Sequence, residues 1–161
     1  MLYKFDVDKY IQMKKVLIGI VVFLILIQLI PIDRTNKPVD PKQNFVEVLK
    51  TPKYLTIMLK NACYDCHSNE VKYPSYAYIA PISWSIKHHV NEGKENVNFS
   101  EWMTYNKDQK EHILDEVIET IGNKEMPFKG YIPMHPEANL TDAQRKILID
   151  YFKGLQKSGQ Y

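Results

Sequence analysis

An uncharged apolar run lies near the N-terminus of the chain. Residues 16–30 read VLIGIVVFLILIQLI, and no residue between 16 and 32 is charged. A helix over these residues has no polar face, unlike a core helix of a soluble protein. At 1.5 Å per residue it spans about 26 Å, close to the roughly 30 Å of a bilayer core. We therefore expect residues 16–32 to form a single transmembrane anchor.

The charges before this run predict its orientation. Four lysines precede it, namely Lys4, Lys9, Lys14 and Lys15. Because positively charged flanks stay in the cytoplasm, residues 1–15 are expected to be cytoplasmic. The rest of the chain is then expected on the periplasmic, extracytoplasmic side of the cytoplasmic membrane. A cleaved signal peptide is the alternative, but residues 27–32 hold none of the small residues of a cleavage site.

Charge balance excludes one class of partner. The four lysines and two aspartates of residues 1–15 account for the whole net charge of +2, so residues 33–161 are neutral. Nucleic-acid binding usually requires a basic excess, and no nucleic-acid partner is expected. Residues 33–45 contain Pro38 and Pro41 and are expected to form a tether, followed by one domain over residues 46–161.

Helix signals dominate this domain. Thr51-Pro52 predicts a helix start, with Thr51 as N-cap and Pro52 at the first helical position, and the helix is expected to run to about residue 62. A second helix is expected from Pro81 to Asn91, stopped by Gly93.

Two capping patterns predict the last helices. Asn106 to Gln109 and Thr141 to Gln144 each place a capping side chain three residues before a glutamine. An apolar stripe at helical spacing follows each one. The stripes are Leu114, Val117, Ile118 and Ile121, and then Ile147, Leu148, Tyr151 and Leu155. No segment shows strand alternation bounded by hairpin turns, so we expect an all-α fold.

The chemistry is concentrated in Cys63-Tyr64-Asp65-Cys66-His67, which contains the only two cysteines of the chain. Cys-x-x-Cys-His is the attachment signature of c-type haem. Cysteines three residues apart lie on one side of a helical turn, where both sulfurs reach the vinyl groups of one porphyrin. The next residue points its imidazole at the iron. We therefore expect one covalently attached haem c with His67 as an iron ligand.

Three other interpretations of the two cysteines remain. A structural disulfide over this spacing would close a tight loop, which is typical of redox motifs. A thioredoxin-like site requires a βαβ context, and none is visible. A zinc site requires two further ligands, and no second Cys-x-x-Cys is present.

The sixth ligand of the iron is expected to be Met126. Pro127 follows it and restricts the backbone in the loop between the last two helices. Met134, His135 and His89 are the alternatives, and either histidine would give a bis-histidine haem.

Seven short motifs follow one another in the sequence. They are Cys63-Tyr-Asp-Cys-His-Ser-Asn69, Tyr73-Pro74, Pro81-Ile-Ser-Trp84, His89-Val90 with Gly93-Lys94, Asn98-Phe-Ser-x-Trp102, Met126-Pro127 and His135-Pro-x-Ala-x-Leu140. In this order they resemble the bacterial haem-binding domain family of membrane-anchored, cytochrome-c-like proteins. Two positions depart from it: Ser75 where an aromatic residue is expected, and Lys94 where arginine is expected. The resemblance implies a c-type haem in a cytochrome-c-like helical fold over about residues 50–155, and gives no reaction.

Four aromatic residues, Tyr73, Tyr78, Trp84 and Trp102, are then expected to line the haem pocket, because such rings pack on a porphyrin face. The favoured function is one-electron transfer by a membrane-anchored monohaem cytochrome with an unidentified redox partner protein. A haem-based sensor or a small peroxidase-like domain with a displaceable sixth ligand is the first alternative. A non-haem thiol or zinc module is the second.

Overall fold

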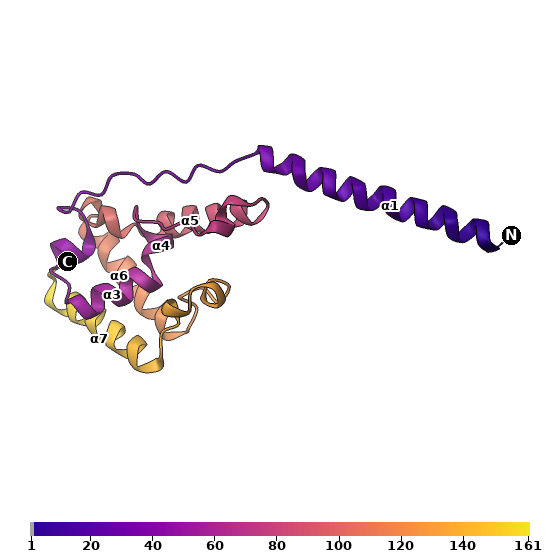
Figure 1. Ribbon diagram of the computed structural model, residues 1–161. Helices are drawn as coiled ribbons and strands as arrows, with labels where there is room; N and C mark the ends of the chain where they lie inside the picture. Colours follow the sequence, from indigo (N-terminus) through magenta and orange to yellow (C-terminus); the bar gives the residue numbers. More distant parts are fainter. Residues whose placement is uncertain (1) are drawn as a thin grey trace. The chain divides into compact units, whose positions relative to one another are not determined.

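The computed structural model describes residues 2–161, with side chains described from Val7 onwards. The described residues form helices and loops without a β-strand, which confirms the all-α prediction. Figure 1 shows the helices in chain order. The chain divides into two compact units. The first unit comprises the N-terminal residues up to Arg34 together with Tyr73–His88. The second unit comprises Thr35–Lys72 and His89–Tyr161.

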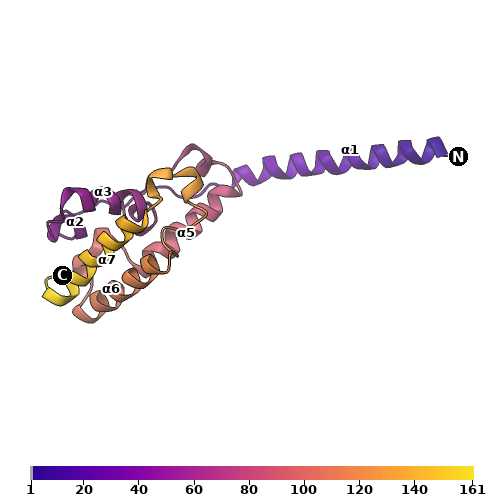
Figure 2. The ribbon, with the colours of Figure 1, turned by 90° about the horizontal axis from the view of Figure 1, so that it is seen from below.

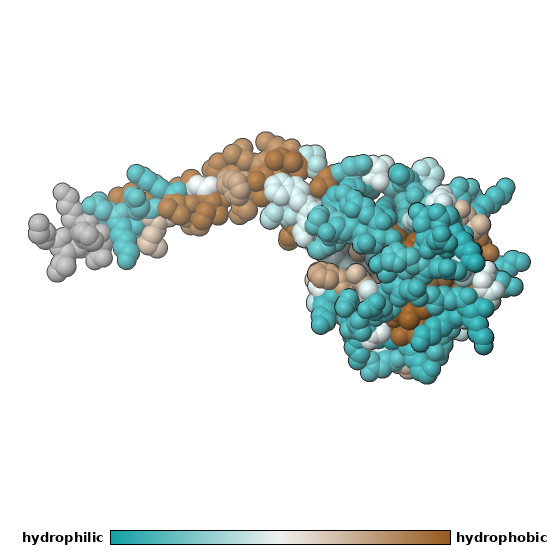
Figure 3. All heavy atoms as spheres, turned by 180° about the vertical axis from the view of Figure 1, so that it is seen from behind, coloured by the Kyte–Doolittle hydropathy of each residue, from teal (hydrophilic) through white to brown (hydrophobic). Residues whose placement is uncertain are grey.

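The first unit begins with the long helix α1, Leu2–Leu26, which continues as the 3-10 turn η1, Ile27–Leu29. The helix starts well before the predicted residue 16, because the preceding lysines, glutamine and methionine are good helix formers. By length and composition, Val7–Leu29 is apolar enough to cross a membrane. Figure 3 shows apolar side chains over the C-terminal part of this helix and hydrophilic side chains before them.

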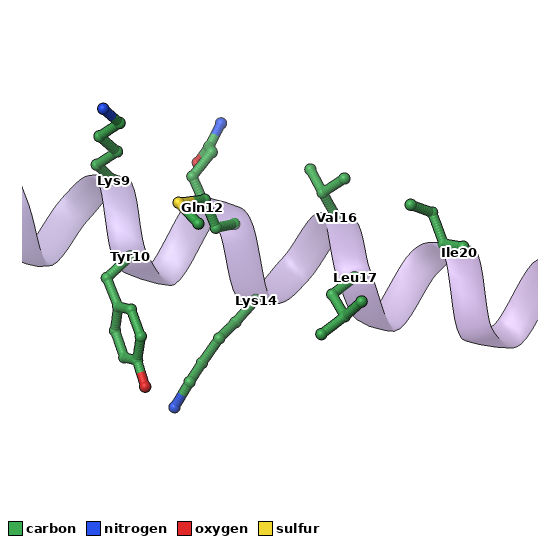
Figure 4. A pocket seen from close by; sticks show the side chains of 8 residues that line it. Lys9, Tyr10, Gln12, Lys14, Val16, Leu17 and Ile20 are labelled. Atoms are coloured by element: carbon green, nitrogen blue, oxygen red, sulfur yellow. The ribbon is translucent and has the colours of Figure 1, made fainter.

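The polar end of this segment carries an aromatic and a cationic side chain on the same side. The Lys14 ammonium lies 4.5 Å from the centre of the Tyr10 ring. Figure 4 shows both side chains on one side of α1, with Lys14 extended back towards the N-terminal end. This direction is the one in which a lysine near the end of a span places its charge at the lipid headgroups.

The remainder of the first unit is the 3-10 turn η2, Ser75–Tyr78, and the start of α5, Ile82–Asn96. α5 ends in the second unit. The prediction that Gly93 stops this helix is wrong, since α5 continues through Gly93 to Asn96. Gly93 lies against Cys66, where a side chain would not fit, and does not terminate the helix.

The second unit is a set of helices around one core. They are α2 (Phe45–Val48), α3 (Lys53–Ala62), α4 (Tyr64–His67), η3 (Phe99–Thr104), α6 (Lys107–Gly122), η4 (Ile132–Met134), η5 (Pro136–Ala138) and α7 (Asp142–Ser158). α6 and α7 lie side by side (Figure 2). Both predicted capping boxes are confirmed, with Asn106 and Thr141 as N-caps.

The core of the second unit is centred on Phe45, which is fully buried. Its ring packs edge-on against Phe99 and Trp102, with ring centroids 5.2 and 4.9 Å apart. Tyr151 and Phe152 of α7 contact the same ring at 6.4 and 6.0 Å. The last residue of the predicted tether therefore connects η3 to α7.

The predicted N-cap Thr51 lies one position too early. α3 begins at Lys53, and Pro52 occupies the N-cap position without a side-chain cap. The Thr51 hydroxyl lies 2.9 Å from the Tyr151 hydroxyl. The Thr51 hydroxyl therefore bonds a distant helix and does not cap α3, whose N-cap is Pro52.

Candidate functional site

The two cysteines and His67 lie on one tight turn. α3 ends at Ala62, and Cys63 has φ −128°, which separates it from the four-residue α4. The His67 and Cys66 amides both donate to the Cys63 carbonyl, at 2.9 and 3.2 Å. Both thiols are free and half-buried. Cys63, Cys66 and His67, the three motif residues expected to hold the haem, thus lie on about one turn of helix.

His67 is oriented by the end of α5. Its Nδ1 lies 2.7 Å from the Gly93 carbonyl oxygen and 3.3 Å from that of Val97. Carbonyl oxygens only accept hydrogen bonds, so Nδ1 carries the proton and Nε2 keeps its lone pair. Burial lowers the pKa of His67, which favours the neutral ring. A neutral imidazole with Nδ1 bonded to a carbonyl is the usual form of a metal-ligating histidine.

Gly93 allows α5 to approach the cysteine turn. A Cβ at this position would lie 2.7 Å from the Cys66 carbonyl oxygen and 3.1 Å from the Cys66 Cβ. Such contacts are too short for any side chain. The Gly93-Lys94 pair belongs to the family pattern, but nothing in the sequence indicates that Gly93 lies against Cys66.

A buried polar network fixes the residues that follow the motif. The Asn69 amide donates to the Ser100 hydroxyl at 3.0 Å, and the Asn98 side-chain amide donates to Asn69 Oδ1 at 3.1 Å. The Asn98 side chain also accepts from the Ser100 amide at 3.1 Å. These residues belong to two motifs of the family pattern. Their proximity gives those motifs a structural role.

The backbone of Met126 is held on both sides. Its amide donates to the Thr120 carbonyl at 3.2 Å. Its own carbonyl accepts from the Arg145 guanidinium at 2.5 Å, and the same guanidinium donates to the Ile121 carbonyl at 3.0 Å. Arg145 is only 7% exposed, whereas Met126 is 38% exposed. The main chain is therefore fixed while the side chain extends from the loop. No pattern in the sequence marks Arg145 as a residue of this site.

The loop after Met126 is bonded to the cysteine turn. The Tyr131 hydroxyl donates to Asp65 Oδ2 at 2.6 Å. Burial and this carboxylate raise the pKa of Tyr131 above its ordinary range. The Tyr131 ring stacks on His135, with centroids 4.0 Å apart and planes 7° apart. This loop carries three of the four candidate sixth ligands: Met126 at its start, exposed Met134 and the stacked His135.

His89 and the predicted pocket aromatics are distributed over both units. The His89 ring lies 5.0 Å from Phe128 of the Met126 loop. Trp102 is fully buried in the core of the second unit, and its indole nitrogen has no hydrogen-bond partner among the residues that the structure describes. Tyr73 and Trp84 belong to the first unit, where the Trp84 indole donates to the Ile30 carbonyl at 3.1 Å. Their role as pocket walls stays a prediction.

The two thiols lack the lowered pKa of a reactive Cys-x-x-Cys pair. Burial raises the pKa of Cys63 to about 12 and that of Cys66 to about 11. A reactive Cys-x-x-Cys pair requires a lowered thiol pKa. Among the residues that the structure describes, no cluster of three or more His, Cys, Asp or Glu side chains could hold a metal ion.

Comparison with known families assigns the chain. The model of the haem-binding domain family matches residues 22–154, most of the chain. The chain belongs to the haem-binding domain family. Comparison with curated proteins and with solved structures gave no match. The family establishes haem binding, as the motifs of the sequence predicted.

The residues of the second unit fit a haem. Nε2 of His67 is available to iron because Nδ1 is bonded to the Gly93 carbonyl. Three large apolar side chains of the loop that contacts the cysteine turn, Met126, Phe128 and Met134, are exposed. A porphyrin would cover such exposed apolar side chains, which lie in the loop that Tyr131 bonds to the cysteine turn.

Proposed function

We propose that this haem-binding domain holds one c-type haem, with Cys63 and Cys66 as the covalent attachment points and His67 as an axial ligand. The single observation that carries the proposal is the orientation of His67, with Nδ1 2.7 Å from the Gly93 carbonyl oxygen. This hydrogen bond selects the tautomer in which Nε2 binds iron. The backbone turn from Cys63 to His67, closed by two hydrogen bonds to the Cys63 carbonyl, supports the proposal because it keeps both cysteines and the histidine within five residues.

We propose one-electron transfer as the function, with Met126 as the sixth ligand. A bound haem supplies an iron that exchanges one electron between its ferrous and ferric states, and thioether ligation raises its reduction potential. The fixed Met126 backbone supports this role, because a ligand on a restrained main chain loses little entropy on binding. The redox partner protein is a further part of the proposal.

The proposed location is the cytoplasmic membrane, with α1 as a single anchor and the haem domain on the periplasmic side. The apolar stretch Val7–Leu29 supports the anchor. The lysines near the start of α1 support a cytoplasmic N-terminus. An alkaline phosphatase fused to the C-terminus should be active, since that enzyme requires an oxidising compartment. An inactive fusion, or a soluble protein that begins near residue 33, would contradict this topology.

Covalent attachment is tested by extraction. Protein produced with a haem maturation system and then denatured should keep its colour in acid–acetone. Cys63→Ser combined with Cys66→Ser should release the haem into the solvent while His67 remains available as a ligand. Colour lost from the wild-type protein would show a non-covalent haem and overturn the c-type assignment.

The sixth ligand is tested by spectroscopy. Thioether ligation of ferric low-spin haem gives a weak far-red charge-transfer band, which Met126→Ala should remove. Met134→Ala is the matched control, because Met134 lies in the same loop and is also exposed. A band that survives in Met126→Ala and vanishes in Met134→Ala would move the assignment to Met134. A wild-type spectrum without the band would favour His135 or His89.

A further inference from the structure

Residues Ala77–Trp84 are bonded to the end of the anchor helix within the first unit. The Gln28 side chain bonds both backbone groups of Ala80, accepting from its amide at 2.9 Å and donating to its carbonyl at 3.0 Å. The Trp84 indole donates to the Ile30 carbonyl at 3.1 Å. The turn that follows Tyr73 is thus held at the level of residues 28–30. Figure 2 shows this turn beside the C-terminal end of α1.

Arg34 extends this junction. Its guanidinium carbon lies 4.0 Å from the centre of the Tyr78 ring, and one of its nitrogens donates to the Ala77 carbonyl at 3.5 Å. Side chains from the end of the anchor therefore bond backbone groups of Ala77 and Ala80 in a segment that includes a 3-10 turn. An irregular segment tolerates removal from water only when its backbone groups have such partners.

The composition of the turn is that of a membrane interface. Residues 73–86 read YPSYAYIAPISWSI, and none of them is charged. Tyrosine and tryptophan are enriched where the hydrocarbon core meets the headgroups. The outward side chains are apolar: Tyr78 is 61%, Ile79 55% and Ile82 50% exposed. Leu29 and Ile30, at the end of the anchor, are exposed as well.

We propose that Tyr78, Ile79 and Ile82 form a second membrane-contact surface, which rests in the interface of the phospholipid bilayer that α1 crosses. In this proposal the exposed Tyr78 ring, with Arg34 over it, faces lipid and replaces the haem-pocket role expected from the sequence. The inference depends on the proposed anchoring by α1. The occupant follows from continuity, because Gln28 and Trp84 bond this turn to the last residues of the span. With Arg34 stacked on Tyr78, a cation stands where phosphate headgroups are expected.

The test uses the full chain, loaded with haem, in nanodiscs of phosphatidylcholine and phosphatidylglycerol. A photoreactive benzoylphenylalanine replaces Ile79 or Ile82, and lipid adducts are measured by mass spectrometry after illumination. The same probe at Leu24, on the span, is the positive control. Tyr54 on α3 is the matched negative control, because it is equally exposed but belongs to the second unit. Haem content equal to the wild type shows that each variant is folded.

The expected result is lipid adducts at Leu24, Ile79 and Ile82, with yields at Tyr54 at least tenfold lower. Adducts at Leu24 without adducts at Ile79 and Ile82 would overturn the membrane-contact surface and leave the anchor intact. A probe at Leu24 that also gives no lipid adduct would show that the anchoring itself is wrong. Cross-links from Ile79 to protein instead of lipid would assign this surface to a protein partner and overturn the proposal.

Discussion

Gly93→Ala tests the contact between α5 and the cysteine turn. The new methyl group would lie 2.7 Å from the Cys66 carbonyl oxygen and 3.1 Å from both the Cys66 carbonyl carbon and Cβ. Two of these three neighbours are backbone atoms, which cannot rotate away. α5 and the turn must therefore separate by several tenths of an ångström. This movement also lengthens the hydrogen bond between His67 Nδ1 and the Gly93 carbonyl.

The magnitude follows from three effects. Forcing an extra methyl group into a packed contact costs about 1–3 kcal/mol. Weakening the His67 hydrogen bond costs up to about 1 kcal/mol. Alanine in a helix interior is favoured over glycine by about 0.5–1 kcal/mol, which offsets part of the loss. With the central value of each effect, the free energy of unfolding should fall by about 2 kcal/mol.

Gly154→Ala is the matched control. Gly154 also lies inside a helix, α7, and a Cβ there meets no atom within 4 Å. This variant should be more stable than the wild type by about 0.5–1 kcal/mol. Urea unfolding of both haem-loaded variants measures the difference in stability. The reduction potential of the haem iron should rise only in Gly93→Ala, because a weaker hydrogen bond at His67 Nδ1 makes the imidazole donate less electron density to the iron. If Gly93→Ala is as stable as Gly154→Ala, the close approach is not a constraint and the reasoning fails.

Three further predictions concern the same unit. Arg145→Met should destabilise the protein by about 3 kcal/mol and weaken the far-red thioether band, because the Ile121 and Met126 carbonyls lose a buried donor. Lys146→Met, on the surface of the same helix, is the control and should change stability by under about 0.5 kcal/mol. Urea unfolding measures both changes. Tyr131→Phe removes the hydrogen bond to Asp65 and should speed amide hydrogen exchange in residues 127–138. Tyr54→Phe, at an exposed tyrosine, is the control and should leave this exchange unchanged. Exchange in Tyr131→Phe equal to the wild type would show that the contact with Asp65 does not hold the loop. Burial raises the pKa of Tyr64, so the neutral phenol contributes its full share of folding stability below about pH 10. Above that pH the free energy of unfolding should fall by about 1.4 kcal/mol per pH unit because of this group. Tyr64→Phe should reduce the slope of the unfolding free energy against alkaline pH by the equivalent of one proton, and an unchanged slope would contradict this.

The sequence predicted correctly those features whose bonding partners lie a few residues apart in the chain. Asn106 and Thr141 cap their helices through partners three residues away, so both capping boxes were predictable. The turn from Cys63 to His67 is equally local, and its bonds stay within five residues. Haem binding followed from this motif and from the order of the other motifs, and the family match confirms it.

The errors arose where a residue serves a distant partner. Gly93 suggested a helix end, yet it sits inside α5 because Cys66 lies against it. Thr51 suggested an N-cap, yet its hydroxyl pairs with Tyr151, 100 residues later. Arg145 gave no signal, because a buried guanidinium that bonds two carbonyls resembles any surface arginine in sequence. Such choices depend on tertiary contacts that no local pattern encodes.

The position of Phe45 has a consequence for the order of events during synthesis. The ring contacts Tyr151 and Phe152 of α7, so the core of the second unit cannot close until the end of the chain has been made. Roughly 85 residues separate His67 from Phe152, and a ribosome adding ~5–20 residues per second needs roughly 4–17 s for them. Throughout this interval the cysteine turn belongs to an unfinished domain. Under the proposed covalent attachment, the two cysteines would be accessible on an open nascent chain before the domain closes around them.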